Sequence, residues 1–236
     1  MIIEKDHTQC LHCTARIHSV INVLDDEKLA DLSIHKSCAN YKKGQYVFTE
    51  NGIPLGLFCV NKGKIKLSVV GMDGKDQILR LAKEGDILGY RALISGERYH
   101  CSAIALEDST ICVIDKNYFH QSIQSNYKLL FEIVKKISSD LKTAEDQIVS
   151  LSQKNIRERM AEALLFLKAT YGFTEDGKTL HVTLSREEIA DYIGTSTEST
   201  IRILAEFSHD KIIELAGKKI KIINLQKLIK NANLND

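Results

Sequence analysis

The stretch Ser185–Phe207, SREEIADYIGTSTESTIRILAEF, is rich in helix formers at both ends but carries a break in its middle. Ser185 with Glu188 three residues later is a capping-box pattern, which predicts that a helix begins at Ser185. Gly194 is expected to end this helix, because glycine adopts a left-handed conformation at little cost. Ser196 or Thr197 can then cap a second helix with its side-chain oxygen. The stretch therefore predicts two short helices joined by a tight turn.

The second helix is amphipathic and is followed by a hairpin. Its apolar positions, expected to face inward, are Thr200, Ile203, Leu204 and Phe207. The runs KIIEL and KIKII flank a turn at Ala216–Lys218, which predicts a β-hairpin. Helix, glycine turn, capped helix and hairpin together indicate a winged helix-turn-helix. A generic helical hairpin is the alternative, and the spacing of Ala190 and Gly194 disfavours it.

The outward side chains of the second helix are of the kinds that read DNA. Glu198 and Arg202 lie four residues apart, so they share one helix face. An arginine can pair with guanine O6 and N7, and a glutamate can accept from a cytosine amine. An ordinary intrahelical ion pair, worth about 0.3–0.5 kcal/mol on a surface, is the alternative. The residues that we expect to contact DNA are Ser196, Thr197, Glu198, Ser199, Arg202, Lys218 and Lys219.

Composition limits the classes of protein to consider. The 236 residues carry a net charge of +1, so no strong overall field attracts nucleic acid or membrane. No apolar run approaches the ~18 residues that span a bilayer, and the N-terminus lacks the layout of a secretion signal. We therefore expect a cytoplasmic protein whose six cysteines are mostly reduced thiols, without a disulfide framework.

Segments with three different sequence patterns follow one another along the chain. Residues 40–115 alternate β-rich runs with glycine turns, which predicts an antiparallel β-roll or barrel. A heptad seam then indicates a long helix that pairs with its copy in a two-fold dimer, although packing on the chain's own barrel is the alternative. The seam residues are Leu130, Val134, Ile137, Leu141, Ala144, Ile148 and Leu151.

The fold class predicted from these sequence patterns is α+β, with three domains. Residues 1–117 are expected to form a β-roll sensor with a short Cys-x-x-Cys segment in front. Residues 118–152 form the dimerisation helix, and residues 153–236 form the winged helix-turn-helix. We find no glycine-rich phosphate loop, nucleophile motif or paired carboxylates, so an enzyme is disfavoured.

In its order of parts, the chain resembles the CRP/FNR family of bacterial transcription regulators. The segments EGDILG and SREEIADYIGTSTESTIRILAEF carry the resemblance most specifically. The resemblance implies a jelly-roll sensor like that of cyclic-nucleotide-binding proteins and a homodimer on a palindromic operator in double-stranded DNA. It also implies contact with RNA polymerase and no membrane. Ile201 and Thr197 depart from the two main branches, so the operator is expected to differ from either standard half-site.

The cyclic-nucleotide branch of the family needs an arginine and serine for the cyclic phosphate. Here His100 and Cys101 precede Ser102, so the arginine is absent from its position, and Arg98 would have to supply the charge. A buried phosphate without a paired cation is poorly compensated. The residues that would line an effector pocket in this region are Gly89, Tyr90, Arg91, Arg98, Cys101 and Ser102.

The FNR branch holds an iron–sulfur cluster, and three cysteines here match its pattern. Cys10 and Cys13 stand at Cys-x-x-Cys spacing, and Cys112 occupies the position of the ligand in the β-roll. Ser19 stands where a third N-terminal cysteine would be. The fourth ligand of a four-iron cluster would then come from Cys38, Cys101, His12 or His18.

Two alternatives to the cluster stay open. Cys10 and Cys13 could hold zinc with two further ligands, or the cysteines could be small apolar fillers. Cys38, Cys59 and Cys101 are interpreted most simply as core or loop residues. The cofactor is therefore unknown, with an iron–sulfur cluster as the hypothesis.

The leading functional prediction is a sequence-specific regulator in which a signal sensed by the β-roll shifts the two DNA-reading helices of a homodimer. The alternatives are a regulator that responds to a cyclic nucleotide and a module that docks a protein without binding DNA. Arg202 and the lysine-rich hairpin argue against the docking module.

Overall fold

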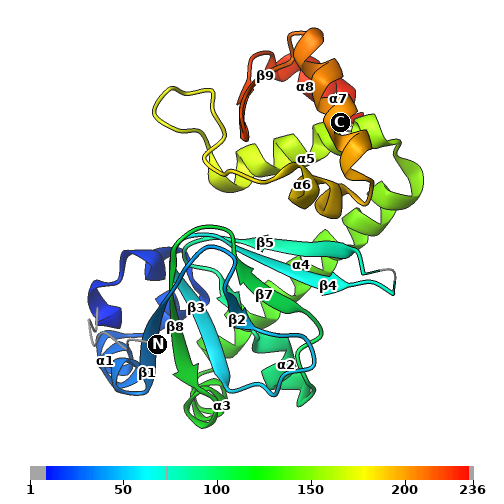
Figure 1. Ribbon diagram of the computed structural model, residues 1–236. Coiled ribbons are helices and arrows are strands. Elements are labelled where there is room, and N and C mark those ends of the chain that lie inside the picture. Colours follow the sequence, from blue (N-terminus) through cyan, green and yellow to red (C-terminus); the bar gives the residue numbers. More distant parts are fainter. Residues whose placement is uncertain (1–8, 73, 234–236) are drawn as a thin grey trace. The chain divides into compact units, whose positions relative to one another are not determined.

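The computed structural model describes residues 9–72 and 74–233 (Figure 1). Contacts divide the chain into two compact units. The first consists of Met1–Val69 and Leu79–Lys142, and the second of Val70–Ile78 and Thr143–Asp236.

Two four-stranded antiparallel sheets form the β-roll. One sheet has the order β1-β8-β3-β6 and the other β2-β7-β4-β5. The strands are β1 (Lys36–Tyr41), β2 (Tyr46–Phe48), β3 (Gly56–Lys62), β4 (Ile65–Val70), β5 (Asp76–Ala82), β6 (Ile87–Leu88), β7 (Ser102–Ala105) and β8 (Ser109–Asp115). The predicted antiparallel β-roll is confirmed. Its core includes the buried side chains of Val60, Ile65 and Ile111.

The N-terminal segment folds as short turns that pack into a second apolar cluster. It contains the 3₁₀ turns η1 (Cys10–His12), η2 (Thr14–His18) and η3 (Val20–Val23), followed by α1 (Asp26–Ile34). Asp25 caps α1 by accepting from the backbone N–H of Lys28. Cys10, Ile21 and Leu29 are buried in the same cluster as Leu57 of β3. The Cys-x-x-Cys pair therefore lies against the β-roll.

The helical segment after β8 is interrupted, which differs from the single helix expected from Tyr118 onward. Lys116–Ser125 forms α3, and the long helix α4 spans Tyr127–Gln153. Asn126 lies between them in an extended conformation. Its side-chain oxygen accepts from the backbone N–H groups of Lys128 and Leu129, so it acts as the cap that starts α4.

Helix α4 presents two apolar faces. Leu129 and Ile133 are buried against the β-roll, with Ile137 partly buried beside them. The predicted seam residues Leu130, Val134, Leu141, Ala144, Ile148 and Leu151 are exposed. The alternative in which the whole seam packs on the chain's own barrel therefore applies to Ile137 alone.

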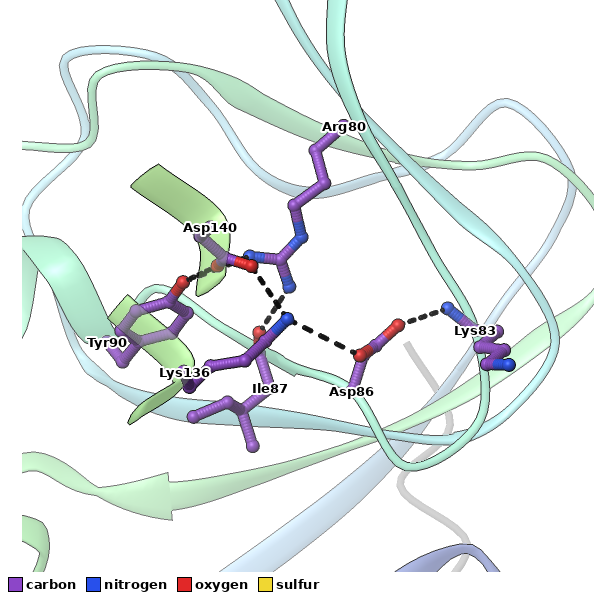
Figure 2. A network of polar contacts seen from close by, with 7 residues as sticks. All are labelled: Arg80, Lys83, Asp86, Ile87, Tyr90, Lys136 and Asp140. Carbon is purple, nitrogen blue, oxygen red and sulfur yellow. Dashed lines mark hydrogen bonds and ion pairs between the residues drawn. The ribbon is translucent and has the colours of Figure 1, made fainter. Parts of the chain in front are cut away.

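A polar network fastens α4 to the β-roll inside the first unit (Figure 2). Asp140 accepts from Arg80 at 2.7 Å, from Lys136 at 2.8 Å and from the hydroxyl of Tyr90. Arg80 also donates to the Ile87 carbonyl at 2.9 Å. Burial opposes charge on Asp140, but the Arg80 guanidinium and the other two donors outweigh burial, so the pKa of Asp140 is lowered.

The second unit contains a small helical domain with a hairpin. Its elements are α5 (Ile156–Tyr171), α6 (Arg186–Ile193), α7 (Thr197–His209), β9 (Ile213–Ala216), β10 (Lys219–Ile222) and α8 (Leu225–Ala232). The hairpin predicted after the helix pair is confirmed. The segment between α5 and α6 forms no named strand but makes the isolated bridges Phe173–Leu180 and Thr179–Lys221.

Candidate nucleic-acid interface and cysteine cavity

The turn between α6 and α7 has the predicted geometry. Ser185 and Glu188 form a complete capping box at the start of α6. Gly194 ends that helix in the left-handed region, with φ of +65°. Ser196 caps α7 by accepting from the backbone N–H of Ser199 at 3.2 Å. The break in the sequence thus separates two short helices.

One side of α7 is buried and the other is open. The four residues expected to face inward are all buried: Thr200, Ile203, Leu204 and Phe207. Ser196, Glu198 and Arg202 are exposed, whereas Thr197 and Ser199 are half-buried. All five therefore lie at the N-terminal part or on the outer side of α7, where a helix-turn-helix contacts a major groove.

Arg202 is held by a partner that the sequence analysis did not predict. Its Nη1 donates to Glu206 Oε1 at 3.0 Å, one turn further along α7. Glu206 Oε2 accepts in turn from Arg157 Nη1 of α5 at 2.9 Å. No ion pair joins Arg202 to Glu198 in the described chain, so the intrahelical Glu198–Arg202 pair considered above is not the arrangement found.

Glu198 instead uses the free N–H groups at the start of α7. The backbone N–H of Glu198 and the Ser196 hydroxyl lower the pKa of its carboxyl group. This follows from the unsatisfied donors and positive dipole end of a helix N-terminus, which favour a negative charge. The carboxyl group of Glu198 is therefore ionised at neutral pH, and both Glu198 and Arg202 are open to solvent.

The hairpin β9–β10 presents Lys218 and Lys219 at its turn. Both are exposed. Arg186 of α6 donates to the Gly217 carbonyl at 2.8 Å, which ties the hairpin turn to the helix pair. Two cations on a fixed turn beside the helix pair are suited to contacts with backbone phosphates.

The residues expected to line an effector pocket are largely occupied by contacts within the protein. Gly89 is the left-handed cap of α2 (Tyr90–Ser95), and the hydroxyl of Tyr90 is bound by Asp140. Arg98 donates to the Asn51 carbonyl at 2.8 Å, and the Ser102 hydroxyl accepts from the Glu50 N–H at 2.9 Å. Arg91 is exposed and Cys101 is half-buried. The serine that would bind a cyclic phosphate and the substitute arginine thus already have partners.

One pair departs from the expectation that the cysteines are mostly reduced thiols. Cys38 and Cys112 form a disulfide. They lie directly opposite each other in the β1–β8 register, with Cα atoms 3.9 Å apart. Antiparallel pairing is what brings them together, since 74 residues separate them in the chain. Cys112, predicted as a metal ligand, therefore has its sulfur bonded to Cys38 in this structure.

A small cavity of about 30 Å³ lies between the N-terminal segment and the β1-β8-β3 sheet. Four cysteines line it: Cys10, Cys13, Cys59 and Cys112. Asn61 Nδ2 donates to Cys13 Sγ at 3.2 Å. The predicted metal residues Cys10, Cys13 and Cys112 are thus brought together. Cys38, another proposed fourth ligand, is tied to Cys112, whereas Cys101 is not among the residues that line the cavity.

Cys59 also lines this cavity, although the sequence analysis interpreted it as a core or loop residue. It lies in β3 directly opposite Cys112 of β8. Burial raises the pKa of its thiol to about 12, although Lys36 nearby acts in the opposite direction. The sequence does place Cys59 and Cys112 in β-rich runs of the same roll. However, only the strand register shows that they are neighbours.

The cysteines around the cavity are of the kind that binds thiophilic metals. Cysteine sulfurs are the ligands of iron–sulfur clusters and of structural zinc. In the described part of the chain, however, no three His, Cys, Asp or Glu side chains are already arranged around one metal position. The Cys38–Cys112 bond accounts for part of this, since a sulfur in a disulfide is not a thiolate ligand.

Two family models match parts of this chain. Residues 38–126 match the cyclic nucleotide-binding domain, and residues 158–230 match the Crp-like helix-turn-helix domain. The anaerobic regulatory protein of Bacillus subtilis is 30% identical over 183 residues, which cover 76% of this chain and 77% of that protein. The chain belongs to the CRP/FNR family of transcription regulators. The predicted resemblance is thereby confirmed.

Other relatives agree with this assignment to the CRP/FNR family. The fumarate and nitrate reduction regulatory protein of Vibrio cholerae is 29% identical over 197 residues, 82% of this chain and 78% of that protein. The structure of FixK2 from Bradyrhizobium japonicum has a TM-score of 0.77 at 22% identity, covering 85% of this chain and 99% of that one. This CRP/FNR chain is a DNA-binding transcription regulator and not an enzyme. In the described residues, no helix is both long and apolar enough to cross a bilayer.

Proposed function

We propose that the protein is a homodimeric regulator that reads a palindromic operator in double-stranded DNA through α7. The observation that carries this proposal is the capped, outward-facing start of α7, where Glu198 and Arg202 are exposed beside a lysine-bearing hairpin. Ser196, Thr197 and Ser199 lie at the same end and can donate to phosphate or to a neighbouring base. Lys218 and Lys219 are assigned to the backbone.

Arg202 is the main base-reading residue in this proposal. Its pairing with Glu206, which Arg157 holds from α5, limits the rotamers of the guanidinium before DNA is bound. A positioned arginine loses less freedom when it pairs with a guanine. Glu206 is therefore a positioning residue rather than a base contact.

The homodimer is supported by the exposed apolar stripe of α4. Leu130, Val134, Leu141 and Ile148 repeat with heptad spacing and are each between 42% and 66% exposed in the single chain. Such a row is unusual on a monomeric helix surface and matches one side of a two-fold helix pair. Two copies of α7 would then read half-sites about one DNA turn apart.

For the signal, we propose a metal or redox change at the cysteine cavity, with an iron–sulfur cluster as its form. The clustering of cysteine sulfurs beneath the N-terminal segment supports this proposal. The relatives named as anaerobic and fumarate–nitrate regulators are in keeping with a signal of this class. A cyclic nucleotide is the weaker alternative, because Arg98 and Ser102 are engaged elsewhere. A cytoplasmic location and contact with RNA polymerase follow from the family and stay proposals.

Selection of binding sites from random double-stranded DNA tests the DNA-reading proposal. We expect enrichment of a two-fold symmetric site whose half-sites lie about 34–36 Å apart. A protein-docking module would enrich no half-site, and that result would contradict the proposal.

Anaerobic purification with absorbance, iron and sulfide assays tests the proposed signal. We expect a coloured protein that loses its colour in air. Colourless, metal-free protein that still binds its operator would contradict the proposed metal signal and leave the DNA-reading proposal intact.

A further inference from the structure

One large apolar side chain lies on the outward side of α7. Ile201 is 52% exposed in the single chain, whereas Ile203 and Leu204 after it are buried. A helix of 3.6 residues per turn places Ile201 on the same exposed side as Glu198 and Arg202. The face assigned to DNA reading therefore has an apolar member that the proposed contacts do not use.

Exposure alone does not assign a role to Ile201, because single exposed apolar residues are common on protein surfaces. Isoleucine is also a weaker helix former than alanine, since its branched side chain loses freedom in a helix. With about half of the side chain open to solvent, packing within the domain offsets little of this cost. A contact made only in a complex would offset it.

The side chains around Ile201 leave it accessible. Ala205, one turn further along α7, is exposed and carries only a methyl group, so it does not cover its neighbour. Arg202 donates to Glu206 Oε1 at 3.0 Å, and helical spacing puts Glu206 on the flank of Arg202 away from Ile201. Ile201 and Ala205 thus form a small apolar strip beside the guanidinium of Arg202.

The four bases differ in the groups that they present in the major groove. Guanine, adenine and cytosine present hydrogen-bond donors and acceptors, and only thymine adds a methyl group, at C5. An isoleucine side chain has no donor or acceptor, so it gains nothing from a polar edge and leaves that edge without a partner. It gains free energy by removing a methyl group from water. The base whose chemistry suits the apolar strip is therefore thymine.

We propose that Ile201, with Ala205 beside it, selects a T·A base pair by packing on the C5 methyl group of thymine. This inference rests on the proposed function, in which α7 reads an operator, and adds a residue that determines the sequence of that operator. Ile201 and Arg202 are consecutive and point about 100° apart around the helix axis, so they contact neighbouring base pairs. Each half-site should therefore place a thymine next to the guanine that Arg202 reads.

The test uses the full-length protein and the operator enriched from random DNA. Each thymine of the half-site is replaced in turn by deoxyuridine, which lacks only the C5 methyl group, and affinities are measured by mobility shift. A second probe replaces the T·A pair by C·G, with either cytosine or 5-methylcytosine, so that the methyl group returns without thymine. We compare wild type with Ile201→Ala, Ile201→Val and Arg202→Ala.

Deoxyuridine at one position next to the guanine is expected to weaken wild-type binding about fourfold per half-site, the value of one buried methyl group. Replacement in both half-sites should weaken it roughly fifteenfold, because the free energies of distant contacts add. Wild type should bind 5-methylcytosine about fourfold more tightly than cytosine at the same position. Ile201→Ala should lose both effects, Ile201→Val should keep them, and Arg202→Ala should keep them at lower overall affinity.

Ile229→Ala is the matched control, since it removes a 38% exposed isoleucine from α8. It should respond to deoxyuridine and 5-methylcytosine as wild type does. Thermal unfolding shows whether Ile201→Ala has folded. We expect this variant to be at least as stable as wild type, because alanine is the better helix former at an exposed position. A loss of methyl discrimination therefore reports on the contact with DNA.

Two results would overturn the assignment of Ile201. One is a half-site with no thymine beside the guanine, and the other is a folded Ile201→Ala that discriminates against deoxyuridine as wild type does. Either result leaves DNA reading by α7 standing, because the operator is still enriched and bound. If no half-site is enriched from random DNA, the proposed function fails, and the role of Ile201 fails with it.

Discussion

At the scale of single residues, two side chains with functional potential depend on residues that lie far away in the sequence. Arg202 is oriented by Glu206 and, through it, by Arg157 of another helix. Cys59 is of functional interest only because it lies opposite Cys112 on the neighbouring strand. The Arg202–Glu206 pair is a contact that the spacing of four residues allows, but neither the bond from Arg157 to Glu206 nor the pairing of Cys59 with Cys112 follows from local spacing.

Replacing Arg202 by Ala is expected to weaken binding to the selected operator by about 1–3 kcal/mol and to relax selectivity at one base pair per half-site. The loss reflects a missing bidentate contact to a guanine. Mobility shifts on the operator and on single-base-pair variants measure it. Lys230→Ala, which removes an exposed cation of α8, is the control. Equal weakening of Arg202→Ala on every sequence would mean that Arg202 binds only phosphate.

At the scale of elements, the turn at Gly194 and the network at Asp140 set the positions of whole helices. Gly194 separates α6 from α7, and Asp140 holds α4 on the β-roll. The turn was predictable, because glycine and a capping residue act locally. The network was not, because Arg80 and Asp140 are 60 residues apart.

Replacing Gly194 by Ala is expected to destabilise the helix pair by about 2–3 kcal/mol and to weaken operator binding. The left-handed backbone costs a side chain about 1–2 kcal/mol, and the new Cβ would lie 2.8 Å from Leu151 Cδ2. Gly217→Ala is a matched control, since its φ is also positive but no atom lies within 4 Å of an added Cβ. Thermal unfolding of both variants measures the difference in stability. Equal losses of stability would contradict the expectation that contact with Leu151 adds to the cost of a side chain at Gly194.

Replacing Asp140 by Asn is expected to cost about 3 kcal/mol at pH 7, because Arg80 and Lys136 lose their common counter-charge. The pKa of Asp140 is lowered by folding, so its stabilisation is complete above its unfolded pKa of about 3.9 and is lost as pH falls through the folded value. Denaturation from pH 7 downward should therefore show a constant difference from wild type until about pH 4, and a shrinking one below.

A control for Asp140→Asn is Glu132→Gln, which removes an exposed ion pair with Lys135. We expect it to cost less than about 1 kcal/mol. A loss for Asp140→Asn no larger than this would show that apolar contacts alone hold α4 on the roll.

At the scale of the whole molecule, the single chain leaves the apolar stripe of α4 exposed to solvent. The stripe of α4 exposes Leu141 at 59% and Ile148 at 66%. Burying such side chains gains about 1.5–3 kcal/mol each, which a second copy of the helix would supply. We therefore treat the dimer as part of the protein's stability as well as of its operator geometry.

Replacing Leu141 by Lys is expected to raise the dissociation constant of the dimer by roughly a thousandfold, because two copies of the side chain are lost from a two-fold interface. Sedimentation equilibrium measures it. Lys142→Ala, one position off the stripe, should change little. A variant that stays dimeric at the same concentrations as wild type would place the interface elsewhere.

The sequence by itself determined the β-roll, the long helix, the capped helix pair and the family, because turn residues, caps and periodicity act over a few neighbouring residues. It also placed Cys10, Cys13 and Cys112 among the candidates. Only the tertiary structure decided that Arg157 holds Glu206, and that Cys59 and Cys38 flank Cys112. These facts depend on strand register and on contacts between distant segments, which no local pattern in the chain encodes.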